Sequence, residues 1–142
     1  DLGPEPLSYE FNNEVLYKAS IGKSKNIKTF IMDNKIVVGV GNIYASESLF
    51  LAGISPKRVS GRTSKNRYQT LTKSIKKILT DAINNGGTTL NDFSNVDGSP
   101  GYFSQVLCVY DRENMPCIRC NGKIKRIIQN QRATYYCPKC QN

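Results

Sequence analysis

Apolar residues recur at the spacing of an α-helix through most of the first 85 residues. Ser8 is the expected N-cap of the first helix, Gly53 stops the third, and Gly86 ends the fourth. The fourth helix has the clearest buried face, with apolar positions spaced from Tyr68 to Ile83. The pattern predicts helices over residues 9–19, 27–33, 43–52 and 64–85.

The pattern changes near the end of the chain, where β-branched and aromatic residues predict strands over 123–129 and 133–136. The dipeptide at 130–131 is the expected turn, which places Arg132 near the tip of a hairpin. Residues 86–105 are polar and glycine-rich, and carry few structural signals. We therefore expect a mainly α fold with a small β-hairpin.

Four of the five cysteines follow the spacing CxxC–x16–CxxC, which is typical of a four-cysteine zinc site. The alternative, two disulfides, has no secretory feature to support it. A site whose four positions are all filled by protein is structural, so we expect one structural Zn²⁺. Its predicted ligands are Cys117, Cys120, Cys137 and Cys140. Cys108 lies in an apolar run and is interpreted as a core residue, because no histidine is present to activate it as a thiol nucleophile.

The composition narrows the function classes. The 142 residues include 20 Lys+Arg, 11 Asp+Glu and no His, giving a net charge of +9, and 39% are hydrophobic. No apolar run approaches the ~18–20 residues of a membrane span, and we expect no signal peptide. The lack of His excludes Ser-His-Asp and Cys-His catalysis, and the scattered acids disfavour a carboxylate-pair hydrolase. A basic protein that meets a polyanion is the remaining interpretation.

The positive charge gathers in segments. Residues 115–142 carry six bases and no acid, which coding bias toward Lys does not explain. A basic hairpin with Arg132 near its tip suits a phosphate backbone, although Arg132 could also be a solvated turn residue. Upstream, Gly41 and Asn42 begin a predicted helix whose N-terminus favours an anion. Asn42 could equally be an ordinary N-cap, but the lysines between residues 23 and 28 favour a nucleic-acid backbone.

Four ordered motifs carry a resemblance to a known family. They lie at residues 2–6, 32–47, 86–90 and 131–137. Together they closely resemble the C-terminal half of bacterial formamidopyrimidine-DNA glycosylase, also called 8-oxoguanine DNA glycosylase/AP lyase. The resemblance implies a helix–two-turn–helix DNA-binding domain over 1–86 and a four-cysteine zinc finger over 107–142. It also implies that residues 87–106 close over the extruded oxidised base, where composition alone allows a plain surface excursion.

The resemblance also implies roles for individual residues. Asn42 and Lys28 match phosphate-contacting residues, and Lys23 lies in the same basic segment. Arg132 matches the zinc-finger arginine that grips phosphate and donates a proton in δ-elimination. Tyr110 resembles a further backbone contact.

The implied function is base-excision repair. Such an enzyme removes oxidised purines (8-oxoguanine, formamidopyrimidines) from double-stranded DNA and cleaves the abasic site by β,δ-elimination. Its nucleophile is an N-terminal proline amine beside a glutamic acid, whereas this chain opens with Asp1 and its prolines Pro4 and Pro6 are acylated. We therefore expect a DNA-binding piece that is inactive alone and whose partner is its own N-terminal catalytic domain.

Two alternatives remain open at this stage. One is an endonuclease VIII-type glycosylase for oxidised pyrimidines, which the motif at 131–134 and the segment 86–105 disfavour. The other is a stand-alone, non-catalytic DNA-binding zinc protein. In either case we expect a monomer without a membrane partner, located in the bacterial cytoplasm and associated with the nucleoid.

Overall fold

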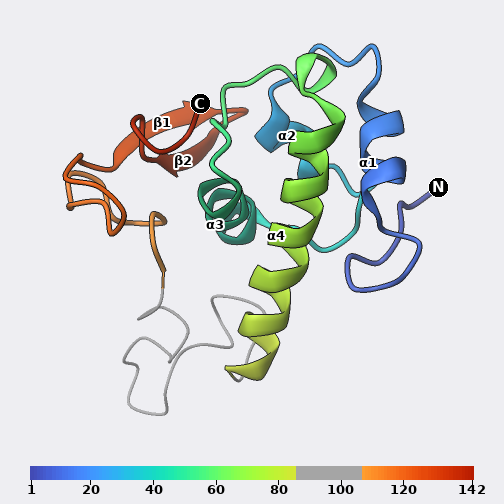
Figure 1. Ribbon diagram of the computed structural model, residues 1–142, viewed down its shortest axis with the longest axis horizontal. Coiled ribbons are helices and arrows are strands. Elements are labelled where there is room, and N and C mark those ends of the chain that lie inside the picture. Colours follow the sequence, from blue (N-terminus) through green and yellow to red (C-terminus); the bar gives the residue numbers. More distant parts are fainter. Residues whose placement is uncertain (86–106) are drawn as a thin grey trace.

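The computed structural model describes residues 1–85 and 107–142. Its helices are α1 (Asn13–Ser20), α2 (Ile27–Ile31), α3 (Asn42–Ala52) and α4 (Lys65–Asn84), with a 3-10 turn η1 (Ser60–Arg62) before α4. The strands β1 (Lys125–Gln129) and β2 (Arg132–Tyr136) form an antiparallel hairpin (Figure 1). The predicted mainly α fold with a small β-hairpin is confirmed. The predicted helix end at Gly86 and the predicted lesion-covering loop at 87–106 lie outside the described residues.

The first helix starts four residues later than predicted. The Oδ1 of Asn12 accepts a hydrogen bond from the Val15 N–H at 3.0 Å, which makes Asn12 the N-cap. Ser8, the expected cap, instead donates its hydroxyl to the Glu5 carbonyl at 2.7 Å in a preceding turn. Capping by Asn26 begins α2 at the predicted residue, but this helix ends at Ile31 rather than at residue 33.

Helix α3 lies at the centre of the molecule, with α4 packed on one side and β2 on another (Figure 1). Gly53 ends α3 as predicted, because its φ of 73° is left-handed and suits glycine. Ser64 caps α4, whose apolar stripe enters the main core; the buried members of that stripe are Tyr68, Leu71, Ile75, Leu79 and Ala82. Within residues 1–85 and 107–142, no helix is long and apolar enough to cross a membrane.

The hairpin forms around a two-residue turn. Asn130 and Gln131 have φ values of 49° and 65°, the left-handed pair that a type I′ turn needs. Gln129 and Arg132 are the last paired positions, so Arg132 lies at the tip as predicted. Arg132, Thr134 and Tyr136 therefore share one face of β2, and alternate residues face the other way.

A second core joins the hairpin to α3. Both carboxylate oxygens of buried Glu47 are used, because they accept backbone N–H groups of Cys108, Val109 and Tyr110 at 2.7 to 2.9 Å. Arg119 donates to the Phe50 carbonyl at 3.0 Å and lies 4.5 Å from the Phe50 ring centroid. These contacts dock the zinc-binding part on α3. Burial, with the negative charge of Glu47, raises the pKa of Cys108 to about 11, which fits a packing residue and not a nucleophile.

Candidate nucleic-acid interface and zinc site

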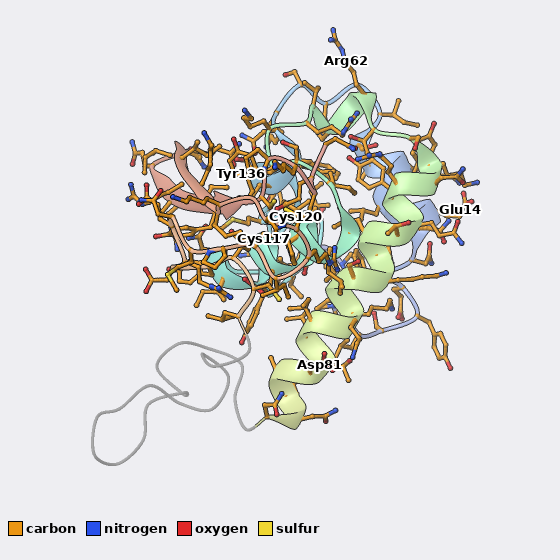
Figure 2. All side chains as sticks on the ribbon, turned by 60° about the vertical axis from the view of Figure 1, so that its left-hand side comes forward. Glu14, Arg62, Asp81, Cys117, Cys120 and Tyr136 are labelled. Carbon is orange, nitrogen blue, oxygen red and sulfur yellow. The ribbon has the colours of Figure 1, made fainter. Side chains whose placement is uncertain are left out.

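The four predicted zinc ligands come together as one cluster. Their Sγ atoms all lie within 4.8 Å of one another, with Cys117 and Cys140 at 3.8 Å and Cys120 and Cys137 at 3.6 Å. Figure 2 labels Cys117 and Cys120 of this cluster. Thiolates held about 2.3 Å from Zn²⁺ at tetrahedral corners lie about 3.8 Å apart, so the donor set fits this metal. The same spacing is far longer than a sulfur–sulfur bond of about 2 Å, which rules out the disulfide alternative in this structure.

The surroundings of the sulfurs favour metal binding. Burial opposes ionisation of Cys117, but hydrogen bonds from the backbone N–H groups of Arg119 and Cys120 and from the neighbouring thiols together lower the pKa of Cys117 to about 7. Burial and hydrogen bonding among the thiols raise the pKa of Cys137 and of Cys140. All four can ionise together only around a cation, which is what binding one structural Zn²⁺ provides.

A buried polar junction joins α2, α3 and the hairpin. The Nζ of Lys28 donates to the Oδ1 of Asn42 at 2.5 Å and to the Oγ1 of Thr134 at 2.7 Å, with the Ala133 carbonyl at 3.4 Å. The Nδ2 of Asn42 donates to the same Ala133 carbonyl at 2.9 Å. Asn42 is the first residue of α3 and not its cap, since Gly41 holds the cap position without a side-chain bond. The N-cap interpretation of Asn42 is therefore wrong.

Among the described residues, Lys28 is a buried cation without a counter-ion. Its side chain is buried (1% exposed), and no carboxylate of residues 1–85 or 107–142 forms an ion pair with it. Burial, and then the positive charge of Arg132, lower the pKa of Lys28 to about 8. Lysines of such pKa can act as Schiff-base nucleophiles. Here the bonds of the ammonium to Asn42 and Thr134, together with its burial, shield it from a substrate carbon.

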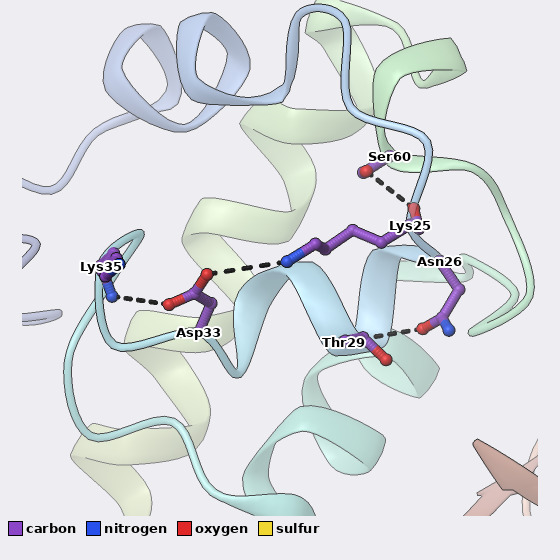
Figure 3. A network of polar contacts seen from close by, with 6 residues as sticks. All are labelled: Lys25, Asn26, Thr29, Asp33, Lys35 and Ser60. Atoms are coloured by element: carbon purple, nitrogen blue, oxygen red, sulfur yellow. Dashed lines mark hydrogen bonds and ion pairs between the residues drawn. The ribbon is translucent and has the colours of Figure 1, made fainter. Parts of the chain in front are cut away.

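The junction opens on a basic cavity of about 350 Å³ between α2 and the hairpin tip. Lys25, Lys28, Thr29, Met32, Asp33, Gln129, Asn130 and Arg132 line it. Figure 3 shows how Lys25 is held: its Nζ lies 3.7 Å from the Asp33 carboxylate, and its carbonyl accepts the Ser60 hydroxyl at 2.8 Å. Asp33 is further fixed because it accepts the Lys35 N–H at 2.9 Å. Arg132 is exposed and forms no ion pair with residues 1–85 or 107–142, so its donors are available to a ligand on this part of the surface.

The structure brings together Lys28, Asn42 and Arg132 from the predicted site but does not bring Lys23 to the cavity. Lys23 is exposed, and Lys25 takes the position beside the cavity. Tyr110 lies in the second core instead, because its ring packs edge-on against Tyr135 with centroids 5.1 Å apart.

Sequence reasoning missed three residues that build this site. Thr134 fixes the Lys28 ammonium, Gln129 donates to the Pro56 carbonyl at 3.0 Å, and Glu47 anchors the segment before the zinc finger. Glu47 lies in the motif at 32–47 and Thr134 in the motif at 131–137, and this membership was the sequence feature that could have identified them as site residues. Gln129 lies outside these motifs, and no sequence feature identified it as a site residue.

Comparisons with protein families agree with the architecture. Residues 2–94 match the formamidopyrimidine-DNA glycosylase H2TH domain, and residues 116–142 match the zinc finger found in FPG and IleRS. Fold and site thus define a helix–two-turn–helix protein with a four-cysteine zinc finger. The predicted domain boundaries at 86/87 and 106/107 remain predictions.

Sequence comparison with known proteins points to one enzyme family. The chain is 64% identical over 140 residues to formamidopyrimidine-DNA glycosylase of Ruthia magnifica subsp. Calyptogena magnifica, and 56% identical to that of Idiomarina loihiensis. In each case the match covers 99% of this chain and 52% of the relative, so the chain spans about half the length of the curated relatives it matches.

Solved structures of proteins from the same family match the fold of this chain. The MutM (Fpg) protein of Thermus thermophilus matches with a TM-score of 0.88 and 35% identity, covering 99% of this chain and 53% of that one. The Lactococcus lactis Fpg in complex with abasic-site DNA matches with a TM-score of 0.88 and 34% identity, covering 99% and 52%. The chain belongs to the formamidopyrimidine-DNA glycosylase (Fpg, MutM) family.

Proposed function

We propose that this chain is the DNA-binding half of a DNA glycosylase/AP lyase that removes oxidised purines and cleaves the abasic site by β,δ-elimination. The observation that carries the proposal is the buried Lys28 cation beside exposed Arg132, since Lys28 has no ion-pair partner among residues 1–85 and 107–142. A DNA phosphate at this surface would supply the missing negative charge. The relatives solved with abasic-site DNA and with DNA containing a carbocyclic 8-oxo-G support a damaged duplex as the partner.

Asn42 and Arg132 are the direct phosphate contacts in this proposal. One N–H of the Asn42 amide goes to the Ala133 carbonyl, and the second has no assigned partner among the described residues. Arg132 presents a planar fork of donors at the hairpin tip, and it also takes the proton-donor role in δ-elimination that the family resemblance implies. Lys28 acts mainly through its charge and by holding Asn42, because its ammonium is already bonded inside the junction.

The remaining predicted contacts keep their proposed roles. Lys23 attracts the DNA backbone from its exposed position, and Tyr110 contacts the backbone beside the hairpin. Residues 87–106 cover the extruded base. The protein acts as a monomer in the bacterial cytoplasm, associated with the nucleoid.

The chemical steps belong, in this proposal, to a separate catalytic domain with an N-terminal proline amine. The 142-residue chain mixed with an 8-oxoguanine duplex and borohydride should therefore give no covalent product. A trapped adduct, at shielded Lys28 or elsewhere, would contradict the assignment of catalysis to another domain.

The test of the DNA-binding role is Arg132→Ala. Loss of one phosphate contact should weaken duplex binding in all sequence contexts and make the slope of log affinity against log salt shallower by about 1. Arg126→Ala is the matched control, because Arg126 is exposed on β1 and pairs with Tyr135, on the opposite face of the hairpin from Arg132. Equal salt slopes for the wild type and Arg132→Ala would count against the role.

A further inference from the structure

A second basic surface lies beside the first. Lys57, Arg58 and Arg62 border a shallow cavity of about 470 Å³ between the segment after α3 and the end of β2. Tyr136 lines the same cavity, and no aspartate or glutamate of residues 1–85 or 107–142 does. This surface is distinct from the cavity that Lys25, Lys28 and Arg132 line.

The cations of this surface are not neutralised by the described part of the chain. The ion pairs of residues 1–85 and 107–142 involve Lys25, Lys65 and Lys77. Arg58 is held by the Asn142 carbonyl, to which its Nε donates at 3.2 Å. The Nζ of Lys57 lies 5.5 Å from the Tyr136 ring centroid, a cation–π contact that leaves its three donors available. Figure 2 shows Arg62 pointing away from the body of the molecule.

Backbone hydrogen bonds make the two basic surfaces continuous. The Ile27 N–H donates to the Arg58 carbonyl at 2.7 Å, and the Gly61 N–H donates to the Lys23 carbonyl at 2.9 Å. The lysine segment at 23–25 therefore runs beside the segment at 58–61. On the hairpin side, Gln129 bonds to the carbonyl of Pro56, the residue before Lys57. The two surfaces cannot shift independently.

The geometry of β2 sets the distance between them. Arg132 and Tyr136 lie on the same face at opposite ends of this strand. At about 3.3 Å per residue, their Cα atoms lie about 13 Å apart. Laid along the axis of duplex DNA, where each strand carries one phosphate about every 3.4 Å, this distance spans about four base pairs.

We propose that Lys57 and Arg62 extend the phosphate-binding surface, so that the protein holds duplex backbone about four base pairs beyond the phosphate at Asn42 and Arg132. This inference rests on the proposed DNA-binding function. Continuity with that interface, and the lack of acidic neighbours, favour duplex DNA over an acidic protein segment as the occupant. The Lys57–Arg62 surface continues the Arg132 cavity on one side only, so the added contacts lie on one flank of the lesion.

The test uses three duplexes of 15 base pairs that carry an abasic-site analogue at the centre or near either end. Because the three duplexes share length and charge, they differ only in the length of DNA on each side of the abasic-site analogue. Lys57→Gln/Arg62→Gln should weaken binding by about three- to tenfold to the central duplex and to one off-centre duplex. It should leave affinity for the other off-centre duplex unchanged, since that DNA ends before Lys57. The salt slope should become shallower by up to about 2 on the affected duplexes.

Lys18→Gln/Lys73→Gln is the matched control, because it removes two charges from exposed positions on α1 and α4. Equal losses on all three duplexes, or no loss on any, would overturn the inference. Loss of binding to a decaglutamate peptide with unchanged DNA affinity would also overturn it and assign the surface to an acidic segment. If the wild-type protein binds no duplex, or if Arg132→Ala leaves its affinity and salt slope unchanged, the proposed function fails instead.

Discussion

The zinc cluster and the Lys28 junction both join distant segments, but they balance charge in opposite ways. At the cluster, four thiols surround one point and are spaced for a divalent cation. At the junction, one buried ammonium is surrounded by neutral acceptors, and the neighbouring charge of Arg132 has the same sign. The first site is closed and structural, whereas the second is the one to which the proposed function assigns an external phosphate. This difference is why we assign phosphate binding to the junction and a supporting role to the zinc cluster.

Removal of zinc should have the largest effect, because the hairpin carries Thr134 and Arg132 into the junction. Metal binding to such clusters is coupled to folding of the finger. Chelation should unfold residues from about 107 onward and lower duplex affinity at least about tenfold. Circular dichroism and fluorescence anisotropy measure the two losses. Full affinity without metal would show that the finger is dispensable.

Cys108→Ala gives the control for this experiment. Cys108 lies outside the four-sulfur cluster, so this variant should still bind one zinc per chain and respond to chelation like the wild type. A metal content below one in Cys108→Ala would place Cys108 among the ligands.

A change of pH should have an intermediate effect on duplex affinity, because the pKa of Lys28 is lowered to about 8 in the free protein. A bound phosphate favours the charged ammonium, so binding takes up a proton above pH 8, and affinity should fall about tenfold between pH 7 and 9. Folding stability should change in the opposite direction. Between pH 8 and about 10, the unfolded chain holds a proton that the folded chain has released, so stability rises with pH.

Lys28→Met separates these effects from other titrations. This variant should lose the fall in affinity between pH 7 and 9 as well as the rise in stability above pH 8. The comparison uses duplex titrations and urea unfolding at each pH. A wild type whose affinity stays flat between pH 7 and 9 would refute the idea that Lys28 responds to the phosphate.

The smallest effect should come from Thr134→Val, which removes one acceptor of the Lys28 ammonium with little change in shape. A hydrogen bond to a charged group contributes about 1.5–3 kcal/mol, so stability should fall by about that amount at pH 7. Loss of the acceptor should also move the pH dependence of binding to lower pH. Thr72→Val is the control: Thr72 is also buried, but its hydroxyl donates to the Tyr68 carbonyl within α4. It should leave the pH profile of binding unchanged.

The sequence alone specified the parts of the molecule that depend on local spacing. The zinc ligands follow from two CxxC turns, and the hairpin tip follows from the dipeptide at 130–131. The start of the first helix could not be decided in this way, since Ser8 and Asn12 are both good caps and only the fold selects Asn12.

The Lys28 junction could not be predicted from local sequence patterns, because its contacts join residues that are distant in the sequence. The partner of the Asn42 amide is the Ala133 carbonyl, 91 residues away, and a backbone carbonyl has no sequence signature. Composition likewise cannot separate Lys23 from Lys25, although only Lys25 lines the cavity. The buried state of Lys28 depends on Thr134 and Asn42 arriving together, so its lowered pKa needed the assembled structure.

The central claim is that Asn42 and the hairpin hold one backbone phosphate of damaged DNA. Its most direct test replaces single phosphates near an abasic-site analogue with neutral methylphosphonates and measures affinity for the wild type and for Asn42→Ala. One position should weaken wild-type binding strongly and add little further loss to Asn42→Ala, because both changes remove the same contact. Losses that simply add at every phosphate position would contradict the claim.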